Sequence, residues 1–327
     1  MVLTATRLRL VFAFSHSPTG KPVEPCDAIG RSWVGVVLMA SVTSLPELVT
    51  GVSSVTFANV PDIAIGDVLG SCAFNMLILA LLDALHKPMP LSTKAHRGHI
   101  LSAGLGILLL SIVAMSLAFG TTLPPLGWIG LYSLLFVLIY SIAMRLIYTY
   151  EKKQLAEFVK DHAVELKYKT ISIGTAVFHY LANALVVIIA AIFLPKIGEG
   201  IAETTGLGQT FVGNIFIAIS TSLPEVVVCV AAVRLGAIDL AIGNLFGSNI
   251  FNVFILAIDD AFFIKGPLLS FANPNHIISA LSAICMTAIA VIGMTYRAER
   301  KRTFIAWDSI GILLCYVANL LLLYIKT

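Results

Sequence analysis

Long apolar runs separated by short polar segments dominate this chain of 327 residues. Each run approaches the roughly 20 residues that an α-helix needs to cross the hydrocarbon core of a bilayer. The runs predict nine spanning helices, at about 33–56, 62–83, 98–119, 124–149, 171–195, 208–233, 238–263, 275–295 and 304–325. The pattern therefore predicts an all-α polytopic membrane protein.

One polar connection is much longer than the others. Residues 151–170 are rich in charge, contain neither Gly nor Pro, and separate four predicted spans from five. We expect a short amphipathic cytoplasmic helix or linker here. It divides the chain into a first transmembrane half, 1–150, and a second, 171–327.

The amino-acid composition agrees with a membrane protein. Hydrophobic residues make up 58% of the chain and charged residues 12%, with a mean hydropathy of +0.94, which excludes an ordinary soluble domain. The net charge of +3 is spread over loops, so nothing favours a nucleic-acid partner. The five cysteines are scattered and indicate buried small side chains rather than a disulfide framework.

The basic residues predict the orientation. If the chain starts inside, eighteen Lys and Arg residues fall on the cytoplasmic side, and Lys196, Lys265 and Lys326 fall on the other. Cytoplasmic loops retain Lys and Arg, so the amino terminus is expected inside and the carboxyl terminus outside. The expected location is the plasma (inner) membrane, with the lipid bilayer as partner.

The chain contains an internal repeat. The segment "SWVGVVLMASVTSLPELV" at 32–49 aligns with "TFVGNIFIAISTSLPEVV" at 210–227, with an offset of 178 residues. "AIGDVLGSCAFNMLILALLD" at 64–83 aligns with "AIGNLFGSNIFNVFILAIDD" at 241–260, with an offset of 177. The first copy, 32–83, begins inside, whereas the second, 210–260, begins outside. Inverted repeats with interrupted helices are typical of secondary transporters, whose site lies at the midplane between the copies.

Each repeat places a proline and a glutamate in the middle of a span. Glu47 and Glu225 each lie where an acidic side chain costs about 2.5–3.5 kcal/mol on insertion scales. Pro46 and Pro224 each remove a backbone donor and free carbonyls one turn earlier. In lipid, such carbonyls are tolerated only where something else satisfies them. A bound cation would satisfy the carboxylates and the carbonyls together.

Further oxygen atoms surround these positions. The candidate ion ligands are Glu47, Glu225, the Thr and Ser pairs Thr43, Ser44, Thr221 and Ser222, the Ser and Asn pairs Ser71, Asn75, Ser248 and Asn252, and the freed carbonyls near Ala40 and Ala218. The Ser and Asn of the second motif are four residues apart, on one helical face. A set of oxygens alone suits hard cations such as Ca²⁺ or Na⁺.

Each feature has a simpler explanation when it stands alone. A proline in a membrane helix can be a kink, and a Ser or Asn can join two helices by a hydrogen bond. A single glutamate can be a protonated structural group. The duplication of all four residue types at symmetric places favours ion binding.

Other polar residues give less indication of function. Close helix packing explains the glycines at 66, 70, 243 and 247. We expect His86, His96 and His99 to be solvated in a cytoplasmic loop, and Asp83 and Asp260 to be interfacial. The role of Asp67, which aligns with Asn244, is open.

The paired "TSLPE" and Gly-(Asp/Asn)-x-x-Gly-Ser-x-x-x-Asn segments resemble the alpha repeats of the calcium/cation antiporter superfamily, in particular its sodium/calcium exchanger branch. The resemblance implies two inverted five-helix halves that exchange Ca²⁺ for Na⁺ by alternating access, with no cofactor. It implies that Glu47 and Glu225 are the principal ion carboxylates. Hydroxyls would come from Ser44, Ser222, Ser71 and Ser248, and the flanking sodium positions would use the carbonyls of Ala40, Thr43, Ala218 and Thr221.

The chain departs from that family in two places. Some relatives carry an aspartate at one of the positions occupied by Asn75 and Asn252, so the number of Na⁺ ions and the potassium dependence stay open. The span at 171–195 has no full counterpart near the start of the chain, where the longest apolar run is about five residues, so we expect a truncated first helix.

Other functions remain as alternatives. A proton-coupled exchanger of the same fold is disfavoured because its second-half signature, Gly-Asn followed shortly by Glu, is absent. A truncated homologue with impaired transport is the other alternative. An enzyme is not expected, because the sequence has no HExxH, GxSxG or paired His motif.

Overall fold

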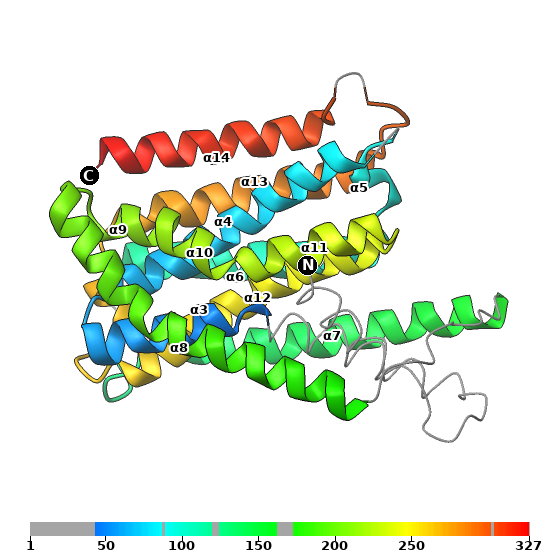
Figure 1. Cartoon of the computed structure of the whole chain (residues 1–327). Helices are drawn as coiled ribbons and strands as arrows, with labels where there is room; N and C mark the ends of the chain where they lie inside the picture. The colour runs from blue at the N-terminus through cyan, green and yellow to red at the C-terminus, as the bar shows by residue number, and fades with distance from the viewer. Residues whose placement is uncertain (1–42, 87–88, 120–123, 162–172, 302–303, 327) are drawn as a thin grey trace.

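The computed structural model describes residues 43–86, 89–119, 124–161, 173–301 and 304–326. Within these ranges the chain forms a bundle of helices that run in alternating directions, and no strand is present beyond an isolated bridge between Leu126 and Ile129 (Figure 1). The predicted all-α class is therefore correct.

The bundle contains long and short helices. The long helices are α4 (Pro61–Leu85), α6 (Gly98–Phe119), α7 (Leu131–Asp161), α8 (Ile173–Thr205), α12 (Ile238–Phe262), α13 (His276–Tyr296) and α14 (Trp307–Ile325). The short helices are α3 (Leu45–Ser53), the π-helix η1 (Ser54–Ala58), α5 (Leu91–Lys94), α9 (Gln209–Val212), the π-helix η3 (Gly213–Ile217), α10 (Ala218–Thr221), α11 (Leu223–Arg234) and the 3-10 helix η4 (Leu268–Phe271).

Seven of the described helices are long and apolar enough to cross a membrane. The pair Gln209–Thr221 and Leu223–Arg234 is long and apolar enough when taken together and bends by 46° at its break, so it makes an eighth span if it is counted as one. These eight match the predicted second to ninth spans. The predicted first span, 33–56, is described only from residue 43 onward.

The predicted start of the fourth span was wrong, whereas its predicted end near residue 149 agrees with the spanning segment Leu131–Tyr150. Helix α7 begins at Leu131 rather than near residue 124, because two prolines and Gly127, whose φ is +66°, form a turn before it. It continues to Asp161, so the first part of the predicted 151–170 connection is helical.

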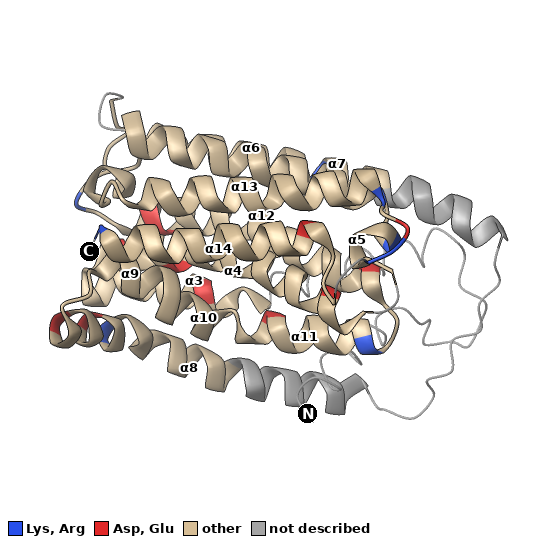
Figure 2. Ribbon diagram, turned by 90° about the horizontal axis from the view of Figure 1, so that it is seen from above, with Lys and Arg blue, Asp and Glu red and all other residues tan. Residues whose placement is uncertain are grey.

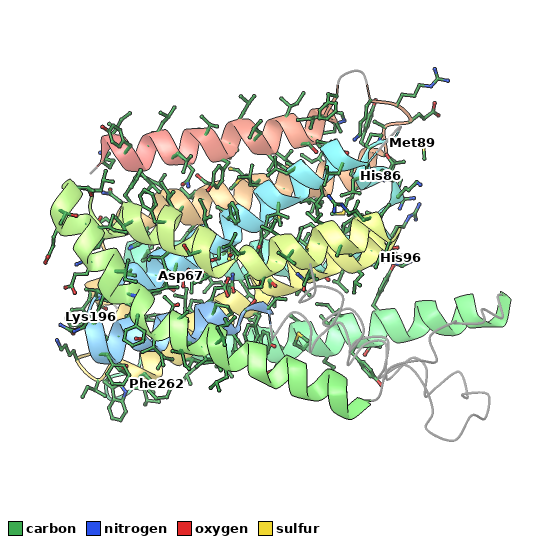
Figure 3. All side chains as sticks on the ribbon, viewed as in Figure 1. Asp67, His86, Met89, His96, Lys196 and Phe262 are labelled. Atoms are coloured by element: carbon green, nitrogen blue, oxygen red, sulfur yellow. The ribbon has the colours of Figure 1, made fainter. Side chains whose placement is uncertain are left out.

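The two ends of the bundle carry most of the basic residues. We call the end at which α4 begins the Pro61 end, and the end at which it finishes the Leu85 end. Figure 2 shows Lys and Arg concentrated at the ends of the bundle. Lys196 and Phe262 lie at the Pro61 end, and His86, Met89 and His96 lie at the Leu85 end (Figure 3).

Helices α4 and α12 form the centre of the bundle. In each of these helices, 72% of the most apolar 18-residue stretch is buried, compared with 22% in α7 and in α8. Glycines allow a close approach to α4: a Cβ added at Gly70 would lie within 2.3 Å of the carbonyl oxygen of Asn214 in η3, and one at Gly66 would lie 3.0 Å from Gly213 Cα. The predicted close packing is thus confirmed at Gly66 and Gly70.

Candidate ion-binding site

Both "TSLPE" segments break their helix in the same way. Ser44 precedes α3 with φ −90° and ψ 11°, and Ser222 precedes α11 with φ −85° and ψ 7°. Pro46 and Pro224 then occupy the first turn of the new helix, where a missing N–H leaves no intrahelical bond unmade. The repeated sequence therefore produces two matching breaks, one from each half of the chain.

The carboxylates at the two breaks meet the hydroxyls of the opposite repeat. Ser222 Oγ donates to Glu47 Oε1 at 3.0 Å, and Ser44 Oγ donates to Glu225 Oε1 at 3.4 Å. Ser248 Oγ also lies 3.4 Å from Glu225 Oε1. Glu47 is 1% exposed and Glu225 is fully buried. The two halves therefore enclose one polar site that is closed to solvent.

A chain of hydroxyls leads from this point to Asp67. Ser222 Oγ lies 3.0 Å from Ser71 Oγ, and Ser71 Oγ lies 3.4 Å from Thr221 Oγ1. Thr221 donates to Asp67 Oδ1 at 2.7 Å. Figure 3 places Asp67 inside the bundle. Asp67, whose role the sequence left open, therefore belongs to the same network.

The equivalent contact in the other half uses an amide. Thr43 Oγ1 lies 3.5 Å from Asn244 Oδ1, at the position that aligns with Asp67. Both threonines thus approach the same position of the opposite repeat. Because Asp67 is an acid and Asn244 is not, the site carries an extra ionisable group on one side.

The two predicted asparagines are both buried, but they differ in their partners. Asn75 Nδ2 donates to Asn249 Oδ1 at 2.9 Å, and Asn249 Nδ2 donates to the carbonyl oxygen of Cys72 at 3.2 Å. Asn252 is fully buried, and neither of its side-chain polar atoms has a partner among the described residues. Asn249 was missed because it aligns with Cys72, so the comparison of repeats did not mark it.

Several buried acceptor atoms have no donor within the described part of the chain. They are Glu47 Oε2, Asp67 Oδ2, Asn75 Oδ1 and Asn252 Oδ1. Each buried acceptor left without a partner costs about 1–3 kcal/mol. These atoms have the oxygen chemistry that hard cations prefer.

One of the backbone carbonyls predicted as ligands already accepts hydrogen bonds. The carbonyl oxygen of Ala218 accepts a hydrogen bond from the Ser222 backbone N at 3.0 Å, and Thr221 Oγ1 lies 3.2 Å from it. The Ala218 carbonyl oxygen therefore keeps a backbone hydrogen bond in spite of Pro224. Ala40 lies outside the described residues.

Sequence reasoning missed a pair of symmetric histidine–aspartate contacts. His99 Nε2 lies 2.9 Å from Asp239 Oδ1, and His276 Nε2 lies 3.0 Å from Asp62 Oδ1. The expectation that His99 is solvated was wrong: it is 8% exposed, because α6 begins at Gly98 and places the ring against the first turn of α12. Each pair joins the first half of the chain to the second, at opposite ends of the bundle.

The other two histidines stay near the Leu85 end. His96 is exposed, as expected. His86 is partly buried, and this desolvation, together with the positive charges of Lys94 and Lys301, lowers the pKa of its imidazole.

Asp83 and Asp260 lie at equivalent helix ends, and both side chains are buried within the protein. Asp260 accepts hydrogen bonds from Gly130 N at 2.8 Å, Tyr132 Oη at 2.8 Å, Ser133 Oγ at 2.5 Å and Leu268 N at 2.6 Å. Both aspartates therefore anchor the loops that follow their helices.

Asp83 has a comparable set of partners at the Leu85 end. It accepts hydrogen bonds from Leu91 N at 2.8 Å and Ala306 N at 2.7 Å, and it forms an ion pair with Lys301 at 2.9 Å. Lys301 also donates to the Asp83 backbone carbonyl and to that of His86.

In the ranges that the structure describes, no three or more His, Cys, Asp or Glu side chains are grouped so that they could hold a metal ion. Hydroxyl, amide and carbonyl oxygens would have to complete the coordination of any cation in this site.

Comparison with known proteins identifies the family. The family model described as sodium/calcium exchanger protein matches residues 27–149 and 175–325. This chain belongs to the sodium/calcium exchanger protein family. The predicted superfamily and branch are thereby confirmed, and the family is one of transporters rather than enzymes.

Two curated relatives of this exchanger-family protein are prokaryotic. Inner membrane protein YrbG of Escherichia coli is 28% identical over 230 residues, which cover 68% of this chain and 66% of that protein. Sodium/calcium exchanger MaX1 of Methanosarcina acetivorans is 32% identical over 149 residues, 45% of this chain and 40% of that protein. The matches thus span about two thirds of the first relative and less than half of the second.

Solved structures share the fold. The sodium-calcium exchanger NCX_Mj has a TM-score of 0.59 at 20% identity, over 97% of this chain and 93% of that one. Native YfkE has a TM-score of 0.61 at 17% identity, over 99% and 98% of the two chains. The all-α fold built from inverted repeats fits this family.

Proposed function

We propose that this protein is a secondary active antiporter that exchanges Ca²⁺ for Na⁺ by alternating access. The observation that carries the proposal is the reciprocal contact between repeats: Ser222 with Glu47, and Ser44 with Glu225. It supports a single cation site built half from each repeat, at the position where inverted-repeat transporters bind their substrates.

The proposed ligands are the oxygens that the two repeated motifs supply. They are the carboxylates of Glu47 and Glu225, the hydroxyls of Thr43, Ser44, Ser71, Thr221, Ser222 and Ser248, the amides of Asn75 and Asn252, and the carbonyls of Ala40, Thr43, Ala218 and Thr221. One Ca²⁺, or a set of Na⁺ ions, balances the two glutamates. The number of Na⁺ ions depends on whether Asp67 is ionised as well.

Coupling follows from the electrostatic free energy of the empty site. Without an ion, moving the carboxylates of Glu47 and Glu225 past apolar surface is unfavourable, since an ionised group in hydrocarbon costs several kcal/mol. With Ca²⁺ or Na⁺ bound, the site is neutralised, and a group of helices can rock to expose it on the other side. Exchange is thereby favoured over leakage.

The proposed topology follows the basic residues. The halves 1–150 and 171–327 lie on either side of the cytoplasmic connection at 151–170, the Leu85 end faces the cytoplasm, and the Pro61 end faces outward. The plasma (inner) membrane is the proposed location.

The test is Na⁺-driven uptake of radioactive calcium into inverted membrane vesicles. Glu47→Gln and Glu225→Gln should each abolish uptake, because each removes a charge that balances the ion. Glu203→Gln, at an exposed position of α8, is the matched control and should transport normally. Uptake that survives both site substitutions would contradict the proposed site.

The same vesicles separate the alternatives. Calcium uptake driven by a pH gradient without Na⁺ would indicate a proton-coupled exchanger. A transport-impaired homologue would show no flux under either gradient and no stabilisation by Ca²⁺.

A further inference from the structure

Asp259 is a buried carboxylate that the proposed central site does not use. Its side chain is fully buried, and neither oxygen has a hydrogen-bond partner in the described ranges. The adjacent Asp260, by contrast, accepts four hydrogen bonds. A buried ionised carboxylate is strongly unfavourable unless it is paired, so the position of Asp259 calls for a positive partner.

Asp259 lies on the helix face that lines the central site. Ser248, Asn252 and Asp259 are separated by four and seven residues in α12, spacings that place them on one side of a helix. The three residues therefore form a polar line that leads from the central site toward the Pro61 end.

The Asp259 carboxylate also touches the helix that carries Glu47. A Cβ added at Gly51 would lie 2.4 Å from Asp259 Oδ2, so only a glycine leaves room for it. Gly51 follows Glu47 by four residues on the same face of α3, about 6 Å along the axis. Asp259 therefore packs about one helical turn from Glu47, on the side of the Pro61 end.

The acidic side chains on the Pro61 side of the site do not recur at the equivalent positions of the other repeat. Asp67 interacts electrostatically with both Glu47 and Asp259. The positions equivalent to Asp67 and Asp259 in the other half are Asn244 and Leu82. The Pro61 side therefore holds two acidic side chains that have no counterpart on the Leu85 side.

We infer that Asp259 is a cation-binding carboxylate, which holds a hard metal cation, Na⁺ or Ca²⁺, between the Pro61 end and the central site. Asp67 contributes negative charge from across the bundle, and Gly51 provides the space. This inference rests on the proposed function in one respect: the assignment of Asp259 to the pathway that ions take to the central site. The binding itself does not require transport.

The experiment measures cation binding after the central carboxylates have been removed. In the Glu47→Gln/Glu225→Gln variant, purified in detergent, Na⁺ or Ca²⁺ is titrated against choline chloride at constant ionic strength, and the thermal unfolding midpoint is recorded. The midpoint should still rise with Na⁺ or Ca²⁺. Adding Asp259→Asn should weaken the response by about tenfold or more in cation concentration, which is about 1.4 kcal/mol.

A matched control uses another acid of the same helix. Asp239→Asn, at the Leu85 end of α12, should leave the cation response of the double variant unchanged. Asp259→Leu, which reproduces the residue at position 82, should lose the response yet unfold no more easily than its parent in cation-free buffer, because it removes a buried charge.

Two results would overturn the inference. One is a double variant that does not respond to either cation although the wild type does. The other is a response that persists after Asp259→Asn, which would mean that apolar packing holds the carboxyl group protonated. Failure of the proposed function would give a different result, namely the absence of Na⁺-driven calcium uptake by the wild type.

Discussion

Ser222 of the second repeat lies 3.0 Å from the Glu47 carboxylate of the first, and Ser44 approaches Glu225 in the reciprocal way. Each glutamate is thus hydrogen-bonded by the repeat that does not contain it. A single repeat would leave its glutamate in the membrane without this partner. The second, inverted copy therefore completes the site in addition to doubling it.

Removal of the Ser222 hydroxyl should weaken cation binding. Ser222 Oγ contacts both Glu47 and Ser71, so Ser222→Ala removes one ligand and loosens two others. We expect the Ca²⁺ concentration for half-maximal uptake to rise by about tenfold, equivalent to about 1.4 kcal/mol. Ser220→Ala is the control, because the Ser220 side chain is exposed and bonds only the Phe216 carbonyl oxygen. Equal effects of the two substitutions would argue against a ligand role.

Loss of the Asp260 carboxylate should destabilise the fold. Asp260→Ala leaves two backbone and two side-chain donors without their acceptor, and each such group costs about 1–3 kcal/mol. We expect a loss of more than about 3 kcal/mol in the free energy of unfolding in detergent. Ser133→Ala removes one of these bonds and should cost about 1 kcal/mol. Similar stabilities for the two variants would show that the carboxylate is not an anchor.

The two histidine–aspartate pairs should differ in strength. The Asp62 side chain is 24% exposed and His276 is fully buried, whereas the Asp239 side chain is 59% exposed. Solvent screens exposed pairs, so a double-mutant cycle on His99 and Asp239 should give less than about 1 kcal/mol. The cycle on His276 and Asp62 should give about 1–3 kcal/mol. Thermal unfolding of the single and double alanine variants provides both values, and a stronger pair at His99 would contradict the burial argument.

Gly70 should be far less replaceable than Gly104. A Cβ at Gly70 would collide with the backbone of Asn214, so Gly70→Ala must push α4 away from η3 and distort the site between them. We expect this variant to lose transport. Gly104 has nothing within 4 Å of an added Cβ, and Gly104→Ala should gain up to about 1 kcal/mol from helix propensity. Transport and thermal stability measured on both variants test the contrast, which fails if Gly70→Ala is as active as Gly104→Ala.

Much of the fold followed from patterns that are local in the sequence. A run of apolar residues of spanning length can form only a helix or a barrel in lipid, so eight predicted spans reappear as helices. Alignment of the two "TSLPE" segments located the breaks at Ser44 and Ser222, because a proline in the first helical turn acts on its own neighbours. The start of α7 was misjudged, since the apolar run continues through the turn before Leu131.

The sequence by itself determined the class, the inverted repeat and most of the polar residues of the site, since these depend on composition and on residues a few positions apart. Tertiary structure alone decided which residues meet: the exchange of hydroxyls between repeats, the inclusion of Asp67, the burial of His99 and the contact of Asp259 with Gly51. The partners in these contacts are more than 100 residues apart. Helix packing brings them together, and no periodicity along the chain encodes that packing.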